Sequence, residues 1–591
     1  MEVNKLNKDT WKLEDIYQNQ EEWEADLRQI ETLIEKIEAY QGRLAESADT
    51  FFTALDLSTQ IQQLIEKVYC YARMRRDEDN SNPTAQALFG RAATLLTRVD
   101  TALSFINPEI LELPDNAISI FWQDHRFPLY KHYLEDILRQ KPHTLSSAEE
   151  QVVARAGEIT RTPDEIFKML NNADLTFPVI CDDKGNEIEI TKGNFISLMQ
   201  NKSRRVRRET FQAFYETYRK LENTFAAALN AGVKRDIFYA EVHRHHSARA
   251  ASLFMDNIPS AVYDSLVQTV RSNLKQMHRY MQLRKKILGL DELHMYDIYV
   301  PLVDVEWQIP YPEAVEMLKK GVAVLGESYG KVLAEGLDSR WADIYERKGK
   351  TAGAYCDCIY GVHPFILLNY QNNLDSAFTL AHEMGHAMHF YYSDKEQPFI
   401  YSQPAIFTAE VASTVHESLL MEHLLQTTKD PRKKIYLINY YLEIYRTTLF
   451  RQTMFAEFEQ IIHDRAENGE TLTAQFLKEE YRKLNTAYHG EEMIIDREID
   501  MEWARIPHFY DAFYVYKYAT GLSAAASLVH QILTKGEPAV ERYISFLKRG
   551  CSDYPLNLLR EAGVDMTSPQ PVQDAINRFS GLLDELEKLT A

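Results

Sequence analysis

Apolar residues recur at spacings of three and four over most of the chain, with charged residues between them. This is the period of an α-helix with one buried face, so it predicts helices wherever it persists. Glycine and proline, which interrupt helices, number only 22 and 20 among 591 residues. The sequence therefore predicts a mainly α fold, and the pattern is clearest over residues 20–45, 49–75, 83–105 and 145–172.

Two segments depart from the helical pattern. Residues 173–192 alternate apolar and polar positions around Asp-Asp-Lys-Gly-Asn, which predicts a β-hairpin. Residues 351–370 are rich in β-prone residues, with Gly361 and Pro364 as interruptions, and they predict two short strands. The second of these, Phe365–Tyr370, is a candidate edge strand that could bind an extended peptide through its main chain.

The chain shows no fixed-period repeat and no low-complexity tract. We expect three parts: a helical N-terminal lobe over residues 1–110, a middle segment with the β-hairpin over 111–200, and a large body over 201–591. No linker rich in proline, glycine or serine marks these boundaries.

The formal net charge of −21 and the pI of about 5.4 make an acidic surface. Such a surface disfavours nucleic acid and anionic membranes as partners, because both are polyanions. No window of eighteen or more residues is apolar throughout, so no membrane span is expected. The one basic run, over residues 202–208, is interpreted as a solvated helix face whose charges pair with local carboxylates.

Five cysteines are too few and too scattered for a disulfide framework, and their odd number indicates reduced thiols. Cys356 and Cys358 share a predicted strand, and we interpret them as buried structural thiols rather than metal ligands. The N-terminus lacks the charged-then-apolar pattern of a signal peptide. The expected location is therefore the cytoplasm.

The segment 378–392, F-T-L-A-H-E-M-G-H-A-M-H-F-Y-Y, carries the candidate chemistry. His382 and His386 lie four residues apart, so on a helix they share one face and can hold one zinc ion. Glu383 then stands beside the metal, where it can take a proton from a water whose pKa zinc lowers to about 7. Gly385 costs about 1 kcal/mol relative to alanine inside a helix, so we expect another backbone to approach it closely.

A catalytic zinc site of this kind needs a third protein ligand. His389 and Tyr392 stand where the longer motif H-E-x-x-H-x-x-G-x-x-H requires glycine and histidine, so the third ligand must lie downstream. Glu396 lies in a predicted loop, too close in sequence to fold back over the helix. Glu410 lies near the start of a strongly helical run that can pack against the first helix, and its carboxylate would be costly to bury without a partner. An exposed helix acid is the alternative interpretation of Glu410.

Two residues near Glu410 are candidates to support the ligands without binding metal. Glu417 follows two helical turns later on the same face, where it can accept a hydrogen bond from a ligating histidine. Ser413 lies one turn from Glu410. His389 could imitate a ligand, but the histidine pair is already complete, so we expect it to pack or hydrogen-bond in the core.

Residues 506–522 form a second constellation, with one histidine and four tyrosines within eleven residues: His508, Tyr510, Tyr514, Tyr516 and Tyr518. Buried phenols need hydrogen-bond partners, whereas a simple core face would use leucine and phenylalanine. In a peptidase, such donors can stabilise a developing oxyanion by about 3–4 kcal/mol each. An amphipathic core stripe is the alternative interpretation.

A third cluster, His243, His245 and His246, resembles a metal site in composition. His243 and His245 share no helix face, and their neighbours favour turns. An exposed loop is therefore favoured over a metal site.

Several blocks of this sequence resemble the oligoendopeptidase F family of zinc peptidases, and more distantly thimet oligopeptidase and neurolysin. The resemblance runs nearly end to end. The blocks that carry it are T-W-K-L-E-D-I-Y at 10–17, P-F-I-L-L-N-Y at 364–370, T-L-A-H-E-M-G-H-A-M-H at 379–389, F-T-A-E-V-A-S-T-V-H-E at 407–417 and H-F-Y-D-A-F-Y-V-Y-K-Y-A-T-G at 508–521.

By position, the resemblance implies zinc ligands at His382, His386 and Glu410 and a general base at Glu383. It also implies substrate-side residues in the 508–518 block. There His508 and Tyr514 match best, and the remaining candidates are Tyr510, Tyr516 and Tyr518. The spacing after Tyr514 differs from the thimet branch, so which tyrosine supports the oxyanion stays open.

The resemblance further implies a mainly α, two-lobed metallopeptidase with a deep central channel and a small β-sheet beside the metal-binding helix. The expected function is hydrolysis of internal peptide bonds of short oligopeptides, with one Zn²⁺ per chain. Two alternatives stay open: another zinc hydrolase, such as a carboxypeptidase or dipeptidase, and a non-enzymatic helical binding protein. Neither the cleavage-site preference nor the oligomeric state follows from the sequence.

Overall fold

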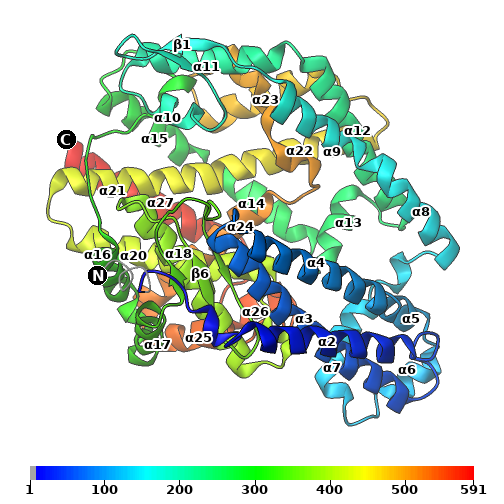
Figure 1. Cartoon of the computed structure of the whole chain (residues 1–591). Coiled ribbons are helices and arrows are strands. Elements are labelled where there is room, and N and C mark those ends of the chain that lie inside the picture. Colours follow the sequence, from blue (N-terminus) through cyan, green and yellow to red (C-terminus); the bar gives the residue numbers. More distant parts are fainter. Residues whose placement is uncertain (1–7) are drawn as a thin grey trace. The chain divides into compact units, whose positions relative to one another are not determined.

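The computed structural model describes residues 8–591, and it is mainly helical with a few short strands, which confirms the predicted fold class (Figure 1). The first seven residues, part of the predicted N-terminal lobe and of the N-terminus judged to lack a signal peptide, lie outside the described range. Among the described helices, none combines the length and the apolar character that crossing a bilayer requires.

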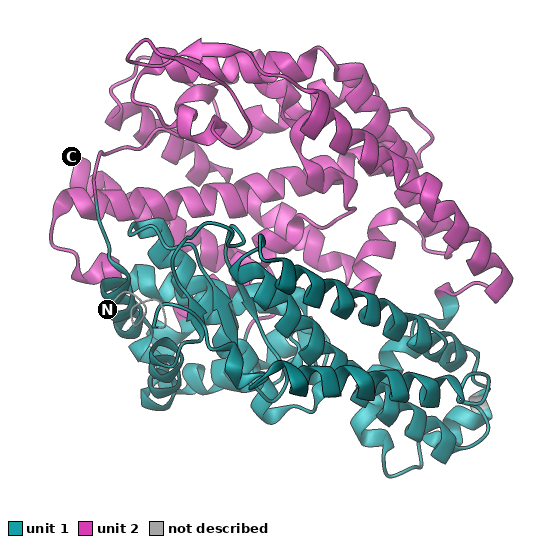
Figure 2. Ribbon diagram, viewed as in Figure 1, with its two compact units in different colours: residues 1–142, 307–423, 531–563 teal, residues 143–306, 424–530, 564–591 magenta. Residues whose placement is uncertain are grey.

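The contacts within the chain group it into two compact units, each assembled from three separate stretches (Figure 2). Unit 1 comprises residues 1–142, 307–423 and 531–563, and unit 2 comprises residues 143–306, 424–530 and 564–591. The division into 1–110, 111–200 and 201–591 stays a prediction. The candidate metal ligands belong to unit 1, and the histidine–tyrosine block belongs to unit 2.

Unit 1 is built from N-terminal helices, a three-stranded sheet and the helices around that sheet. Its elements are η1 (Leu13–Asp15), α2 (Gln20–Glu38), α3 (Ala48–Glu78), α4 (Pro83–Leu103), α5 (Ile106–Glu112), α6 (Asp115–Phe121), α7 (Phe127–Leu138), α16 (Tyr311–Gly321), η5 (Val322–Leu325), α17 (Glu327–Asp338), β4 (Ala342–Asp343), β5 (Tyr355–Asp357), β6 (Phe365–Leu367), α18 (Leu374–Glu396), α19 (Phe399–Ser402), α25 (Glu537–Leu547) and α26 (Pro555–Glu561). Most of α20 (Ile406–Thr427) also belongs to it.

Unit 2 is almost entirely helical. Its elements are α8 (Ser147–Thr160), α9 (Thr162–Met169), η3 (Leu170–Asp174), β1 (Val179–Cys181), β2 (Glu187–Glu189), α10 (Phe195–Met199), α11 (Arg204–Arg219), α12 (Glu222–Val242), α13 (Ala248–Met255), α14 (Ser260–Ser272), α15 (Leu274–Ile287), β3 (Leu293–His294), η4 (Met295–Asp297), α21 (Pro431–Ile444), η6 (Tyr445–Phe450), α22 (Arg451–Glu467), α23 (Ala474–His489), β7 (Met493–Ile494), η7 (Arg497–Arg505), η8 (Pro507–Tyr510) and α27 (Gln570–Thr590). Most of α24 (Tyr516–Lys535) belongs here, and η2 (Lys141–His143) spans the boundary with unit 1.

The predicted helical segments begin where local capping allows. The side chain of Asn19 accepts the backbone N–H of Glu22 at the start of α2, and Ser47 accepts that of Thr50 at the start of α3. Such caps satisfy N–H groups that have no partner within the helix. The predicted helix over 145–172 is instead two helices, α8 and α9, followed by the π-turn η3.

Both predicted β regions form, with one correction. β1 and β2 pair antiparallel within 173–192, as predicted, and β5 pairs antiparallel with β6 within 351–370. A third strand, β4, pairs parallel to β6, so β6 is the central strand of the sheet. The expectation that Phe365–Tyr370 offers a free edge is therefore wrong, because both edges of β6 are occupied. The edge strands of this sheet are β4 and β5.

Candidate metal centre

Helices α18 and α20 meet at backbone contact, and a glycine makes this possible. A Cβ atom on Gly385 would lie 2.5 Å from Cα of Ser413 and 2.9 Å from the carbonyl oxygen of Ala412. No residue with a side chain fits there without moving one helix. The close approach expected at Gly385 is thus confirmed, and it holds the face of α18 that carries His382 and His386 against α20.

Three potential ligand atoms converge beside this contact. Nε2 of His382 lies 3.1 Å from Nε2 of His386 and 3.5 Å from Oε2 of Glu410. Nε2 of His386 lies 3.9 Å from Oε1 of Glu410, and one ligand atom of each residue lies within 4.8 Å of the others. Zinc bonds of about 2.0–2.2 Å in tetrahedral geometry need ligand atoms slightly more than 3 Å apart. The residues present therefore fit one zinc ion with two imidazoles and one carboxylate.

Two further side chains orient these ligands. Glu417 accepts a hydrogen bond from Nδ1 of His382, which leaves Nε2 as the nitrogen that faces the other ligands. The hydroxyl of Ser413 donates to the backbone carbonyl of Glu410 at 2.9 Å and lies 3.5 Å from its carboxylate. The side chain of Glu410 stays 52% exposed. The carboxylate of Glu410 is therefore not buried, and the argument from the cost of burial does not apply to this ligand.

Burial and neighbouring charges shift the pKa values of the two ligand histidines in opposite directions. Burial lowers the pKa of His382, but its hydrogen bond to Glu417 and the negative charges nearby outweigh burial and raise it to about 9. Burial raises the pKa of Glu383 to about 7, and burial with the neighbouring His382 lowers the pKa of His386 to about 3. His386 is therefore neutral and ready to act as a ligand without releasing a proton.

Two thiols lie beside the metal-binding helix, Cys356 in β5 and Cys358 just after it, so they do not share one strand as predicted, and neither is placed as a ligand. Burial raises the pKa of Cys356, and the negative charge of Glu383 raises it further. Cys358 is buried, and its thiol lies 3.2 Å from a carboxylate oxygen of Asp394. Both thiols therefore stay protonated, whereas a metal ligand must be a thiolate. Within residues 8–591, the group of His382, His386 and Glu410 is the one that could hold a metal.

In unit 2, the histidine–tyrosine block divides into two groups. Nε2 of His508 lies 3.1 Å from the hydroxyl of Tyr518, and its ring stacks on that of Tyr514 with centroids 6.1 Å apart. These three side chains are partly exposed. Tyr510 and Tyr516 are buried, and their rings pack in the core, that of Tyr510 on a phenylalanine of α9. The structure thus brings Tyr514 and Tyr518, but not the other two tyrosines, to His508.

The loop that carries Tyr514 has an unusual backbone. Phe513 adopts φ +55°, a left-handed conformation that is a genuine outlier for an aromatic residue. Its N–H donates to the buried carboxyl of Glu459 at 2.7 Å. Ser252 donates to the carbonyl of Ala512 at 2.8 Å, and Arg235 donates to that of Tyr510 at 2.8 Å. Three distant elements therefore fix this short segment.

Glu459 is a residue that sequence reasoning missed. It lies on α22, more than fifty residues before Phe513, and no motif connects the two. Burial raises its pKa well above the usual range, so the carboxyl is neutral. A glutamate among Phe455, Phe458 and Ile462 on a buried helix face was the available signal. Such a residue needs a polar partner elsewhere in the fold.

The remaining candidates have other roles. His389 is buried, with its ring 5.3 Å from that of Phe546, in the packed position expected of it. His245 stacks at 3.7 Å on His143, and neither belongs to a metal-binding group among the described residues. In the basic run, two arginines of α11 pair with the buried carboxylate of Asp297, and two further residues pair with acids nearby. Arg205 pairs locally with Glu209 as expected, but Arg207 and its partner Asp297 are buried and lie 90 residues apart, so the interpretation as a solvated helix face is wrong for Arg207.

Comparisons with known proteins agree over nearly the whole chain. Residues 197–578 match the family model described as Peptidase family M3, and residues 109–177 match the one described as Oligopeptidase F. Oligopeptidase PepF of Bacillus subtilis is 47% identical over 98% of this chain and 87% of its own length. Group B oligopeptidase PepB of Streptococcus agalactiae is 40% identical over 98% of this chain and 97% of its own.

Solved structures are also similar to this chain over nearly its whole length. The crystal structure of oligoendopeptidase-F from Enterococcus faecium is 37% identical and superposes with a TM-score of 0.74, covering 96% of this chain and 99% of that one. A protein from Chlamydophila abortus is 34% identical and superposes with a TM-score of 0.94 over 98% of both chains.

Replacing Gly385 by alanine tests the contact between α18 and α20. The added methyl group would overlap the backbone at Ser413, so we expect a loss of about 1–3 kcal/mol in the free energy of unfolding of unit 1. Gly330, inside α17, serves as the control, because a Cβ atom added there would have no other atom within 4 Å. Gly330→Ala should be neutral or stabilising by about 0.4–1 kcal/mol. Equal thermal unfolding of the two variants would contradict the close contact.

Replacing Glu459 tests how the loop at Phe513 is held. Glu459→Leu leaves a buried N–H without an acceptor, whereas Glu459→Gln keeps a carbonyl oxygen in place. We expect hydrogen exchange over residues 508–518 to accelerate at least tenfold in the leucine variant and to stay near wild type in the glutamine variant. Glu457→Gln, on the same helix, alters an ion pair with Arg271 and is the control. Unchanged exchange in Glu459→Leu would show that the loop does not depend on this carboxyl.

Proposed function

Because this chain belongs to peptidase family M3, we propose that it is a zinc-dependent endopeptidase that cleaves internal bonds of short oligopeptides. The observation that carries the proposal is the convergence of His382, His386 and Glu410, with Glu383 beside them on α18. The relatives named oligopeptidase or oligoendopeptidase support oligopeptides as the substrate class.

The metal would be held by Nε2 of His382, Nε2 of His386 and the carboxylate of Glu410. When bound, zinc polarises a carbonyl group and lowers the pKa of water, which is the chemistry that peptide hydrolysis needs. Glu417 keeps His382 in the tautomer that presents Nε2, and Ser413 restrains the helix turn that carries Glu410. Three protein ligands leave a position for the substrate.

Glu383 is the proposed general base. It follows His382 directly, so its carboxylate lies beside the ligand set without belonging to it. In this position it takes the proton of the attacking water and returns it to the leaving amine. The residue is 7% exposed, which keeps bulk water away from the proton transfer.

For the block in unit 2, we propose that His508 and Tyr514 bind the substrate through hydrogen bonds, including bonds to the developing oxyanion. Burial lowers the pKa of His508, so its ring is neutral near pH 7 and carries one N–H donor. Tyr518, which contacts His508, is a further candidate for substrate binding. The rings of Tyr510 and Tyr516 are buried, so these two tyrosines are not proposed to contact the substrate.

Two alternatives would leave the same metal ligands in place. A carboxypeptidase or dipeptidase would release single residues or dipeptides from an end, whereas an endopeptidase cuts internally. A binding protein would retain the fold without turnover. The intact set of His382, Glu383, His386 and Glu410 favours an enzyme. A cytoplasmic location is also proposed, since all five thiols are free.

Cleavage of an internally quenched peptide of about ten residues tests the proposed reaction. We expect internal products by mass spectrometry, loss of activity with a zinc chelator and recovery when zinc is added back. Release of single terminal residues would favour the exopeptidase alternative. No cleavage by protein that holds one zinc would favour a binding role.

Glu383→Gln tests the general base. The amide cannot accept the proton of water, so turnover should fall by roughly 3–5 orders of magnitude while zinc stays bound. Glu396→Gln, an exposed acid at the end of the same helix, should keep wild-type turnover. Near-normal turnover in Glu383→Gln would rule out the assigned role.

Glu410→Ala tests the third ligand. With one of three protein ligands removed, the variant should release its zinc at ordinary free-metal concentrations. Glu396→Ala is the control, because its partly exposed ion pair with Lys548 contributes only about 0–1 kcal/mol. Metal analysis after dialysis distinguishes the two variants. A fully loaded Glu410→Ala protein would mean that the third ligand lies elsewhere.

A further inference from the structure

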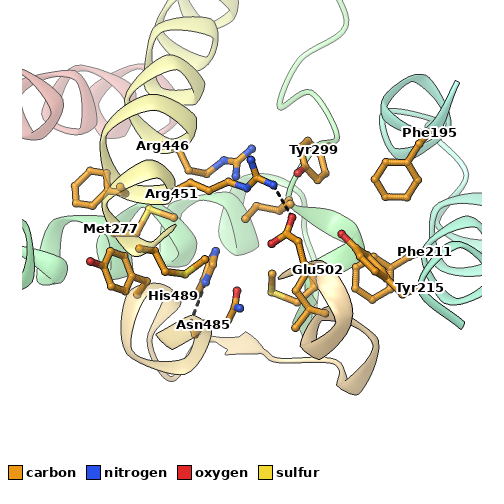
Figure 3. A pocket seen from close by; sticks show the side chains of 16 residues that line it. Phe195, Phe211, Tyr215, Met277, Tyr299, Arg446, Arg451, Asn485, His489 and Glu502 are labelled. Atoms are coloured by element: carbon orange, nitrogen blue, oxygen red, sulfur yellow. Dashed lines mark hydrogen bonds and ion pairs between the residues drawn. The ribbon is translucent and has the colours of Figure 1, made fainter. Parts of the chain in front are cut away.

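Unit 2 contains a small cavity, separate from the metal ligands, whose mostly apolar wall includes several charged and polar side chains (Figure 3). Its volume is ≈ 30 Å³. Pockets for organic ligands measure about 300–1,000 Å³, whereas about 10–15 Å³ suffices for a water molecule. The cavity therefore has room for about two or three water-sized groups. Its polar side chains include Arg446, Arg451, Asn485, His489 and Glu502.

A π-turn places two arginines at this cavity. In η6 the backbone N–H of Arg451 donates to the carbonyl of Arg446, five residues earlier. Residues five apart therefore lie one above the other, whereas in a regular α-helix they would point in different directions. Both arginines line the cavity, and Figure 3 shows both guanidinium groups in this region. Such π-turns are rare in proteins overall, and those that occur often lie at functional sites.

The carboxylates nearby are shared among several arginines. Glu443 accepts hydrogen bonds from Nε and Nη2 of Arg446 at 2.9 and 2.6 Å, and it also lies 3.6 Å from Arg284. Arg284 is fully buried. Asp297 offers this arginine only its backbone carbonyl, because its own carboxylate pairs with two arginines of α11. Glu443 is therefore the carboxylate that serves both Arg446 and Arg284.

The second glutamate is shared in the same way. Glu502 accepts from Nη2 of Arg451 at 2.6 Å and from Nη2 of Arg505 at 3.2 Å. Its other oxygen accepts from the hydroxyl of Tyr481. Across the whole cluster, four guanidinium groups share two carboxylates. Each arginine has a carboxylate partner, but the cluster carries two more positive than negative charges, and Arg284 and Arg446 are buried within it.

The two arginines at the cavity also have donors to spare. Among the described residues, Nη1 of Arg446 and both Nε and Nη1 of Arg451 have no hydrogen-bond acceptor. Burial lowers the pKa of His489 to about 4, so this neighbour is neutral and adds no further charge. The buried amide oxygen of Asn485 has no partner within residues 8–591 either. A water molecule would donate to this oxygen, which an anion cannot do, but water would not balance the two excess positive charges.

We propose that this cavity binds one small monovalent inorganic anion, with chloride as the physiological candidate, between the guanidinium groups of Arg446 and Arg451. A single-atom anion fits the volume, accepts hydrogen bonds from several N–H donors and supplies the missing negative charge. Phosphate, sulfate and peptide carboxylates are too large for this space. The inference concerns unit 2 alone and does not depend on the proposed peptidase activity.

Bromide replaces chloride in such a site and can be located directly. Crystals of the wild-type protein grown in sodium bromide should show an anomalous peak between Arg446 and Arg451 at the bromine edge. The same position in crystals grown in sodium gluconate should lack it. A cavity that contains only water in the bromide crystals would overturn the proposal.

Thermal unfolding provides a second, independent measurement. At constant ionic strength, exchanging gluconate for chloride should raise the unfolding temperature of the wild type in a saturable manner. Arg446→Gln should abolish this increase, whereas Arg271→Gln, which alters a half-exposed ion pair of unit 2, should keep it. An equal response of the two variants, or one that does not saturate, would contradict a specific anion site.

Discussion

The backbone contact between α18 and α20 at Gly385 is the constraint on which the candidate metal centre depends. A Cβ atom there would lie 2.5 Å from the opposite backbone, so the two helices approach more closely than any side chain allows. This contact brings Glu410, on α20, to the two histidines on α18. The third ligand is therefore supplied by helix packing and not by a local motif. A small shift of one helix at this contact would change the distances between the ligand atoms.

Charges and burial around the ligands also determine their protonation states. Glu417 fixes the tautomer of His382 and raises its pKa, while burial keeps His386 neutral. The half-exposed carboxylate of Glu410 completes the set from the solvent side. Thiols nearby stay protonated because burial and acidic neighbours oppose their ionisation. The same principle, that interior charge must be balanced, leads to the proposed anion site in unit 2.

The sequence was sufficient to predict features that local spacing determines. The shared face of His382 and His386 and the mainly helical fold follow from helix periodicity, and the close approach at Gly385 follows from the cost of a glycine inside a helix. Glu410 and Glu417 on the following helix could still be named as partners, but partners without a sequence signal could not be predicted. The pairing of β4 with β6 is one case, because a two-residue strand has no distinctive pattern.

The second constellation shows the same limit. Its tyrosines look equivalent in sequence, yet Tyr516 is buried and Tyr514 stays partly exposed. The left-handed backbone conformation of Phe513 precedes both tyrosines, and the carboxyl of Glu459 on another helix accepts the N–H of Phe513. A strained φ angle for an aromatic residue has no sequence signature, since it depends on the surrounding structure.

X-ray absorption at the zinc edge of the zinc-loaded protein tests the central claim most directly. The account predicts one zinc per chain with only nitrogen and oxygen neighbours at about 2.0–2.2 Å, and outer-shell scattering from two imidazole rings. A sulfur neighbour at about 2.3 Å, which would place Cys356 or another thiol on the metal, would contradict it. So would the absence of bound zinc after reconstitution with one equivalent.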